Sequence, residues 1–225
     1  MDIRSYIDDL KEENLLLGFD DVSFNVSNIA YDSKKVSKGT LFVCKGAAFK
    51  KQYLEEAIEK GACCYVSEDC HDVNIPQIRV GDIRKAMAVI AGRFYDHPDR
   101  KLTLIGITGT KGKTTTAYYI KAILDTFLLN SGKKPAGILS GIFNYYGKDY
   151  EESSLTTPET FELFEKLSEA AENGLEYLVM EVSSQALKYH RTYGLRFDFA
   201  GYLNLDEDHI SPGEHSDFED YKASK

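Results

Sequence analysis

The segment at residues 102–129 constrains the fold more than any other part of this sequence. It begins with an uninterrupted apolar run, LTLIGIT (102–108), continues through the loop GTKG (109–112), and ends in a helical pattern. An apolar run without polar alternation is typical of a strand buried on both faces of a parallel sheet. Parallel strands need a long crossover between them, which is usually a helix. The segment therefore predicts an α/β fold.

Strand and helix patterns alternate along the rest of the chain. The expected helices are 3–16, 52–61, 82–95, 113–129 and 158–174. The expected strands are 27–31, 40–44, 62–67, 76–80, 102–108, 135–140, 176–183 and 198–205, with a polar hairpin at 143–152. This alternation is typical of α/β sheets with mostly parallel strands. DHPDRK (96–101) interrupts it, so we place a domain boundary after residue 97. The expected architecture is a small α/β domain at 1–97 followed by a mostly parallel P-loop domain at 98–225.

Composition excludes several kinds of partner. The formal charge of −9 argues against nonspecific binding to nucleic acid or to an anionic membrane, which needs a basic face. No apolar run approaches the ~20 residues of a membrane span, and the charged N-terminus has no signal-peptide core. The cysteines, Cys44, Cys63, Cys64 and Cys70, form no C-x-x-C pair, and we interpret them as reduced core thiols. We therefore expect a soluble, cytoplasmic protein.

The loop after the apolar strand has the chemistry of a phosphate site. A Walker loop places a glycine five residues before its Gly-Lys-Thr, but Ile107 stands at that position. Gly109 and Gly112 still allow close approach of the backbone to an anion at the positive end of a helix. Lys113 would then contact the β- and γ-phosphates of a nucleotide, and the Thr114 hydroxyl would bind Mg²⁺. The alternative is a glycine-rich turn that binds nothing.

Two further segments place acidic or metal-binding side chains after strands of the same sheet. VMEVSSQAL (179–187) carries Glu181 at a strand end, and NLDEDHI (204–210) carries three acids and His209. Because the carboxyl ends of parallel strands meet at one edge, these side chains are expected to approach the phosphate loop. Carboxylate oxygens are suited to Mg²⁺. The alternatives are a buried glutamate paired structurally and a solvated acidic loop.

These segments resemble a known family, the ATP-dependent Mur ligases of peptidoglycan synthesis. TGTKGKTTT (108–116) is similar to the loop T-G-T-x-G-K-T-T of that family, which accounts for its glycine spacing. EVSSQALKYHR (181–191), LTTPET (155–160) and NLDEDHI…H…E…YKASK (204–225) resemble the MurE type, which adds the third residue of the stem peptide. Residues 31–62 resemble the first domain of MurE and MurF. The similarity covers nearly the whole chain.

The resemblance implies a reaction and its substrates. ATP phosphorylates a carboxylate of UDP-N-acetylmuramoyl-L-Ala-D-Glu, and the amine of a diamino acid attacks the resulting acyl phosphate. Residues 1–97 would bind the UDP-sugar, and 98–225 would form the first part of the central ATP-binding domain. We expect a fragment of a longer, monomeric ligase that cannot complete ligation alone. We expect no nucleic-acid partner and no membrane insertion. The diamino acid stays open between meso-diaminopimelate, L-lysine and another diamine.

The resemblance also implies roles for individual residues, with Lys113 and Lys225 as the catalytic pair. Those implied to bind ATP are Gly109, Thr110, Lys111, Gly112, Lys113, Thr114 and Thr115. Those implied to hold the sugar-peptide substrate are Ser33, Thr156, Thr157, Ser183 and Arg191. Those implied to bind Mg²⁺ are Thr114, Glu181, His209 and Lys225, the last as a carbamate formed with CO₂. Lys222 is the competing carbamate position, and a surface helix-end position is the alternative for Arg191.

Three alternative functions stay open at this point. A MurF-type ligase is the nearest, and EVSSQAL…HR favours the MurE type over it. A generic P-loop NTPase would hydrolyse ATP without a UDP-muramoyl peptide. A noncatalytic nucleotide-binding module would keep the fold and lose the chemistry. The sequence also departs from the family at FKKQYL (49–54), where many members carry an Asp-Gly-His turn, and at Tyr189, where a polar residue is common.

Overall fold

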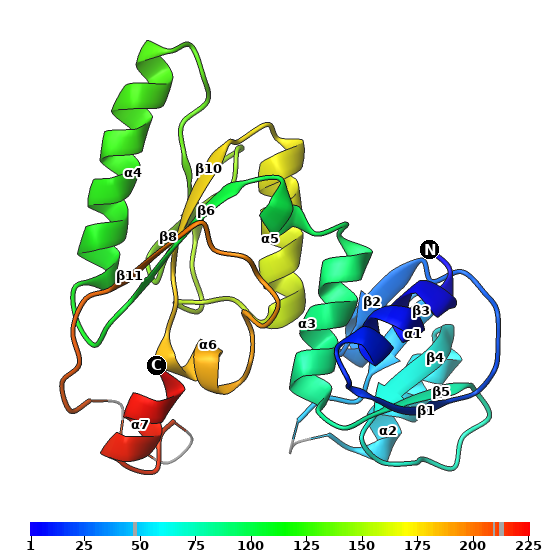
Figure 1. Cartoon of the computed structure of the whole chain (residues 1–225). Coiled ribbons are helices and arrows are strands. Elements are labelled where there is room, and N and C mark those ends of the chain that lie inside the picture. The colour runs from blue at the N-terminus through cyan, green and yellow to red at the C-terminus, as the bar shows by residue number, and fades with distance from the viewer. Residues whose placement is uncertain (47–48, 209, 212–213) are drawn as a thin grey trace. The chain divides into compact units, whose positions relative to one another are not determined.

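The computed structural model describes residues 1–46, 49–208, 210–211 and 214–225. The chain divides into two compact units, Met1–Phe94 and Tyr95–Lys225, each with its own sheet (Figure 1). The boundary expected after residue 97 falls in a turn that contains the left-handed residues Asp96 (φ 54°) and His97 (φ 48°). The expected α/β class with mostly parallel sheets is confirmed in both units.

The first unit is built on a five-stranded sheet in the order β1-β5-β4-β3-β2. Strands β2 to β5 are parallel, and β1 pairs antiparallel with β5. The strands are β1 (Leu16–Phe19), β2 (Asn28–Ala30), β3 (Thr40–Val43), β4 (Ala62–Ser67) and β5 (Gln77–Val80). The helices are α1 (Ile3–Glu12), α2 (Lys51–Glu59) and α3 (Ile83–Phe94), with a short 3₁₀ helix, η1 (Ser33–Lys35), after β2.

The helix expected over 3–16 is wrong at its end. Asp2 caps α1 by accepting a hydrogen bond from the Arg4 amide, but the helix stops at Glu12 and Asn14 turns the chain with φ 56°. Residues 16–19 then form β1, in which Leu17 is 58% exposed. Pairing with β5 outweighs the local helical periodicity here.

The second unit is built on a six-stranded sheet in the order β11-β6-β10-β7-β8-β9. Strands β11, β6, β10 and β7 are parallel, and β8 and β9 form the antiparallel hairpin expected at 143–152. The strands are β6 (Thr103–Thr108), β7 (Gly137–Leu139), β8 (Phe143–Tyr145), β9 (Glu151–Glu152), β10 (Tyr177–Glu181) and β11 (Phe199–Tyr202).

Helices α4 (Lys113–Asn130) and α5 (Thr160–Glu172) lie on opposite sides of this sheet (Figure 1). Alternate residues of β6 show why the strand is apolar throughout. Leu104 belongs to the buried cluster on the α5 side, whereas Ile105 and Ile107 belong to the cluster that includes Ala117 of α4. Because β6 and β10 are parallel neighbours, their carboxyl ends lie at the same edge of the sheet. A ligand site is expected at that edge in such a sheet.

Two short helices complete the second unit, α6 (Ser184–Lys188) and α7 (Phe218–Ser224), and neither was expected as a separate element. Helix α5 begins at Thr160, two positions after the expected start at Pro158. Across the described residues, none of the helices combines the length and apolar character needed to cross a membrane.

The cysteines only partly match the interpretation as core thiols. Cys44 and Cys64 are buried, and burial raises the pKa of the Cys44 thiol to about 12. Cys63 is half-buried, and Cys70 is exposed. The core interpretation is therefore wrong for Cys70, which follows β4 in a loop on the surface.

Candidate active site

The phosphate loop packs tightly against the segment that follows β11. The Thr110 amide donates a hydrogen bond of 3.1 Å to the Asn204 carbonyl. A Cβ on Gly109 would lie 3.0 Å from Cβ of Leu203, so this position needs glycine for the close approach. Gly112 adopts a left-handed φ of 84° immediately before α4. The two glycines thus let the loop turn directly from a buried strand into the positive end of a helix.

Lys113, the first residue of α4, folds back over this loop. Its Nζ donates to the Gly109 carbonyl at 2.9 Å and to the Thr110 carbonyl at 3.1 Å. The ammonium group is therefore held at the helix N-terminus, where both the helix dipole and the lysine favour a bound anion.

Thr114 meets Glu181 at the edge of the sheet. The Thr114 hydroxyl donates to Oε2 of Glu181 at 3.0 Å, and the Gly141 amide donates to Oε1 at 3.0 Å. Glu181 is only 1% exposed. The hydroxyl and carboxylate oxygens suit a hard divalent cation such as Mg²⁺. His209, the third expected ligand, lies outside the described residues, and those residues contain no cluster of three acidic, histidine or cysteine side chains suited to a metal.

A second set of contacts connects β10 to the segment before α5. The Thr157 hydroxyl donates to the Glu181 carbonyl at 2.9 Å and accepts from the Ser183 amide at 3.0 Å. Arg191 donates from Nη1 to the Thr157 carbonyl at 3.1 Å and forms an ion pair with Glu159. Arg191 is 5% exposed, so the alternative of a surface arginine is wrong. Its Nε has no hydrogen-bond partner within the described part of the chain.

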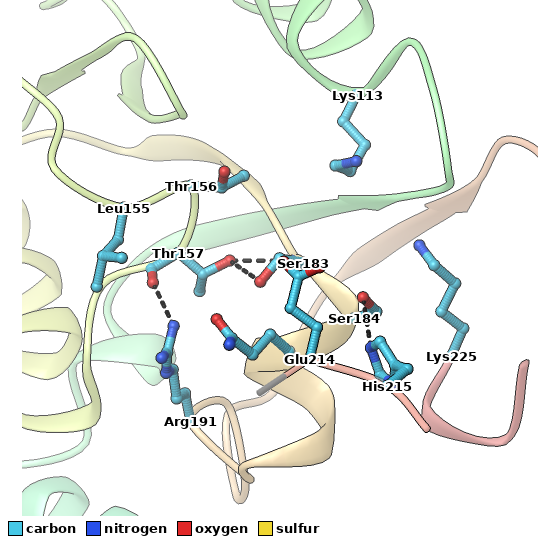
Figure 2. A pocket seen from close by; sticks show the side chains of 11 residues that line it. Lys113, Leu155, Thr156, Thr157, Ser183, Ser184, Arg191, Glu214, His215 and Lys225 are labelled. Atoms are coloured by element: carbon cyan, nitrogen blue, oxygen red, sulfur yellow. Dashed lines mark hydrogen bonds between the residues drawn. The ribbon is translucent and has the colours of Figure 1, made fainter. Parts of the chain in front are cut away.

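These segments enclose a cavity of about 130 Å³ within the second unit (Figure 2). Its lining residues are Lys113, Leu155, Thr156, Thr157, Ser183, Ser184, Gln185, Arg191, Glu214, His215 and Lys225. Six of the residues singled out in the sequence are therefore brought together: Lys113, Thr156, Thr157, Ser183, Arg191 and Lys225. Three of them carry cationic side chains, which makes the cavity suited to an anionic ligand.

Lys225 reaches this cavity from the end of α7. Its Nζ donates to the Thr108 hydroxyl at 3.4 Å and lies 5.1 Å from the centre of the Tyr221 ring. Burial and the positive charge of Lys113 lower the pKa of Lys225 to about 8. Tyr221 is fully buried, and its hydroxyl lies 2.8 Å from Oγ1 of Thr110, so α7 is anchored on the phosphate loop.

Ser33 and Lys222 lie elsewhere. Ser33 belongs to η1 in the first unit, where its hydroxyl donates to Glu56 at 2.9 Å and its carbonyl accepts from Lys60 at 2.9 Å. Lys222 is exposed on α7, pairs with Glu219 at 3.6 Å, and is absent from the described lining of the cavity. The geometry thus favours Lys225 over Lys222 as the lysine of the site.

Sequence reasoning gave no role to Ser184 or His215, although both line the cavity. His215 is 1% exposed, and its Nε2 lies 3.0 Å from the Ser184 hydroxyl. These residues are 31 positions apart, so local spacing does not pair them, although His215 is the second histidine of NLDEDHI…H…E…YKASK. The available signal was the second serine of EVSS at a strand end, which by position faces the same sheet edge as Ser183.

The parallel sheet, the loop after β6 and the cation-lined cavity define a P-loop-type α/β protein. Residues 107–225 match the Mur ligase middle domain family. The chain belongs to the Mur ligase family, which confirms the resemblance inferred from its motifs.

Curated relatives extend the match over both units. A UDP-N-acetylmuramoyl-L-alanyl-D-glutamate–L-lysine ligase of Streptococcus suis is 49% identical over 201 residues, which cover 89% of this chain and 40% of that protein. The ligase of the same name from Streptococcus pneumoniae serotype 2 is 45% identical over 227 residues, covering 97% of this chain and 46% of that protein. A UDP-N-acetylmuramyl-tripeptide synthetase of Bifidobacterium longum is 48% identical over 202 residues, which cover 88% of this chain and 38% of that protein. The chain spans less than half the length of these relatives.

Solved structures show the same fold. A UDP-N-acetylmuramoyl-L-alanyl-D-glutamate–2,6-diaminopimelate ligase superposes with a TM-score of 0.69 at 23% identity, covering 88% of this chain and 40% of that one. MurF from Acinetobacter baumannii superposes with a TM-score of 0.58 at 20% identity, and the match covers 98% of this chain and 44% of that one.

Proposed function

We propose that this chain contributes the substrate- and nucleotide-binding parts of an ATP-dependent amide-bond ligase of peptidoglycan precursor synthesis, acting in the cytoplasm. Its substrate would be UDP-N-acetylmuramoyl-L-Ala-D-Glu. The names of relatives at 45–49% identity support this substrate. The observation that carries the proposal is the 3.0 Å contact between Thr114 of the phosphate loop and Glu181. Thr114 is next in the chain to Lys113, which lines a cavity together with Arg191 and Lys225.

The residues of the cavity fit carboxylate activation by ATP. Lys113 and the loop amides would hold the phosphates, and Arg191 would hold an anionic group of the peptide through its planar fork. A carboxylate oxygen of the substrate then attacks the γ-phosphorus, and ADP leaves with the electron pair. The amine of the incoming amino acid attacks the acyl phosphate, loses a proton, and displaces phosphate. Positioning and charge neutralisation supply most of the rate enhancement in such transfers.

Mg²⁺ would be held by the Thr114 hydroxyl and the Glu181 carboxylate, with Lys225 as a third ligand in carbamate form. The ion, when bound, would neutralise phosphate charge. The carbamate forms when the neutral amine of Lys225 adds CO₂ and releases a proton, which converts a cation into an anionic oxygen ligand. A Lys225 pKa of about 8 supports this, because much of the amine is neutral near that pH.

The role of Ser33 rests on the resemblance of residues 31–62 to the first domain of MurE and MurF, and the choice of amino acid rests on the names of the relatives. Ser33 in the first unit would contact the uridine end of the substrate. The streptococcal relatives carry L-lysine in their names, which supports L-lysine as the incoming amino acid.

Calorimetric titration of this chain with MgADP, and separately with UDP-N-acetylmuramoyl-L-Ala-D-Glu, tests the proposal. Lys113→Met should weaken MgADP binding at least about tenfold, because a charge-assisted contact is lost, and leave folding intact. Lys222→Met is the matched control and should bind as the unsubstituted chain does. A generic NTPase would bind nucleotide but not the muramoyl dipeptide, and a noncatalytic module that ignores ATP would be unaffected by Lys113→Met. Either result would count against the ligase assignment.

A further inference from the structure

His215 and Ser184 form a buried hydrogen-bonded pair in the wall of the cavity. None of the roles proposed above uses either residue. The His215 ring is enclosed between α6 and α7, with Nε2 3.0 Å from the Ser184 hydroxyl (Figure 2). Tyr221 packs edge-on against the ring, with centroids 5.2 Å apart. The ring is therefore held in one orientation. Its effect on Ser184 depends on which of its two nitrogens carries the proton.

Asp220 favours one position for the proton on the His215 ring. Its Oδ2 lies 3.5 Å from Nδ1 of His215 and also accepts hydrogen bonds from Lys188 Nζ (2.6 Å) and the Ser216 amide (2.9 Å). These donors lower the pKa of Asp220 to about 2, so the group is a carboxylate and can only accept. Nδ1 makes no hydrogen bond within the described residues, and the carboxylate 3.5 Å away favours the tautomer that carries its proton on Nδ1.

The other nitrogen is then an acceptor. Burial and the neighbouring Lys188 lower the pKa of His215, which keeps the ring neutral and leaves a lone pair on Nε2. With that tautomer the Ser184 hydroxyl donates its proton to the lone pair, and no contact within the described residues occupies its own lone pairs. Ser183 differs, because its Oγ already accepts from the Ala186 amide at 3.1 Å as the cap of α6.

We propose that Ser184 Oγ accepts a hydrogen bond from an amide N–H of the bound ligand, and that His215 is the positioning residue that fixes the hydroxyl in this orientation. The ligand class is an N-acylated amino acid whose carboxylate is attracted by Lys113, Arg191 and Lys225 in the same cavity. The three cationic side chains would bind the carboxylate of the ligand, and Ser184 would recognise the amide next to that carboxylate. This inference rests on the proposed function, because the muramoyl dipeptide belongs to that class.

An ester analogue of the dipeptide tests the role of Ser184 separately from the proposed function. In UDP-N-acetylmuramoyl-L-Ala-D-Glu the Ala–Glu amide can be replaced by an ester, which removes the N–H donor and also weakens the carbonyl as an acceptor. The change in preference between the unsubstituted chain and Ser184→Ala isolates the part that depends on Ser184. The unsubstituted chain should bind the amide about tenfold more tightly than the ester, the value of one hydrogen bond in an enclosed site. In Ser184→Ala that preference should fall to about twofold or less. His215→Phe, which keeps an aromatic ring, should reduce it similarly by freeing the serine hydroxyl. Ser168→Ala on α5, where the partly buried serine bonds only Glu172 among the described contacts, is the matched control and should keep the full preference.

Nitrogen chemical shifts of His215 in the unsubstituted chain provide a test that does not depend on a variant folding. They should show a neutral ring with the proton on Nδ1 at pH 7.5. A proton on Nε2, or an amide preference unchanged in folded Ser184→Ala, overturns the inference and leaves the proposed function standing. Failure of the unsubstituted chain to bind the dipeptide at all overturns both.

Discussion

At the scale of single residues, Lys225 gives the clearest pH-dependent prediction. Its pKa of about 8 is below the ordinary lysine value because the side chain is half-buried and faces Lys113. A lowered pKa means that the neutral amine is present above about pH 8, whereas an ordinary lysine with a pKa of about 10.4 is almost wholly protonated there. Only the neutral amine adds CO₂. With ¹³C-bicarbonate, a carbamate carbon signal should therefore increase between pH 7 and 9.

Lys222 supplies the matched control for that experiment. Lys225→Arg should remove the carbamate signal, since the guanidinium does not form it, and Lys222→Arg should leave the signal unchanged because Lys222 is solvent-exposed and paired with Glu219. A signal that survives Lys225→Arg and disappears in Lys222→Arg would reverse the assignment of the two lysines.

Glu181 gives a second prediction at this scale, concerning Mg²⁺. Glu181→Gln keeps the shape of the side chain and an oxygen for the Gly141 amide, but removes the negative charge next to Thr114. In the unsubstituted chain, Mg²⁺ should tighten ADP binding about tenfold or more, and in Glu181→Gln the gain should fall to about threefold or less. Glu176→Gln, at an exposed ion pair with Lys133, should retain the full gain. An equal Mg²⁺ effect in Glu181→Gln would place the cation elsewhere.

At the scale of secondary-structure elements, one side chain connects α4 to the start of β7. Asp125 accepts from Lys121 Nζ at 2.7 Å with one oxygen and from the Ala136 amide at 2.8 Å with the other. The Lys121 side chain is only 5% exposed. Asp125→Ala should lower the free energy of unfolding by roughly 3 kcal/mol, because an unpaired charge and an amide remain buried. Urea unfolding followed by circular dichroism measures this.

The double variant Lys121→Met, Asp125→Ala tests whether the unpaired lysine causes the loss of stability in Asp125→Ala. Removing the lysine should recover part of the lost stability, since no unpaired charge then remains. Glu176→Gln, which breaks the exposed pair with Lys133, should cost no more than about 1 kcal/mol. A double variant as unstable as Asp125→Ala alone would show that the ion pair is not the reason.

The elements that sequence alone predicted are those with strong local patterns. Strand β6 and the loop after it follow from an apolar run and two glycines, and α4 follows from the helix that such a loop opens. Strand β1 could not be predicted, because its four residues are defined by pairing with β5, more than 55 positions away along the chain in the register Phe19–Ile78. Helices of five and seven residues, α6 and α7, are too short for periodicity to identify.

The site divides in the same way. The approach of Thr114 to Glu181 could be expected, because parallel strands bring their carboxyl ends to one edge. The burial of Arg191 and the pairing of Ser184 with His215 could not, because they depend on how α6 packs on α7 and on the segment before α5. Local sequence carries no record of such packing.

At the scale of the whole molecule, the division after Phe94 separates the proposed ligand contacts. The phosphate loop, Glu181 and the cavity all belong to Tyr95–Lys225, with their own buried clusters on both faces of the sheet, whereas Ser33 belongs to Met1–Phe94. Residues 95–225 expressed alone should therefore fold and bind MgADP within about threefold of the whole chain, a difference below 1 kcal/mol.

The same piece should bind UDP-N-acetylmuramoyl-L-Ala-D-Glu at least about tenfold more weakly than the whole chain, because the proposed uridine contact at Ser33 is missing. Titration of both ligands into the whole chain, the 95–225 piece and a Ser33→Ala whole chain separates the contributions. Because Ser33 also donates to Glu56, the Ser33→Ala chain must first show an unchanged thermal midpoint. If the folded 95–225 piece binds the dipeptide as tightly as the whole chain does, the uridine end is not held by the first unit, and the cavity beside Lys225 must account for all of the affinity.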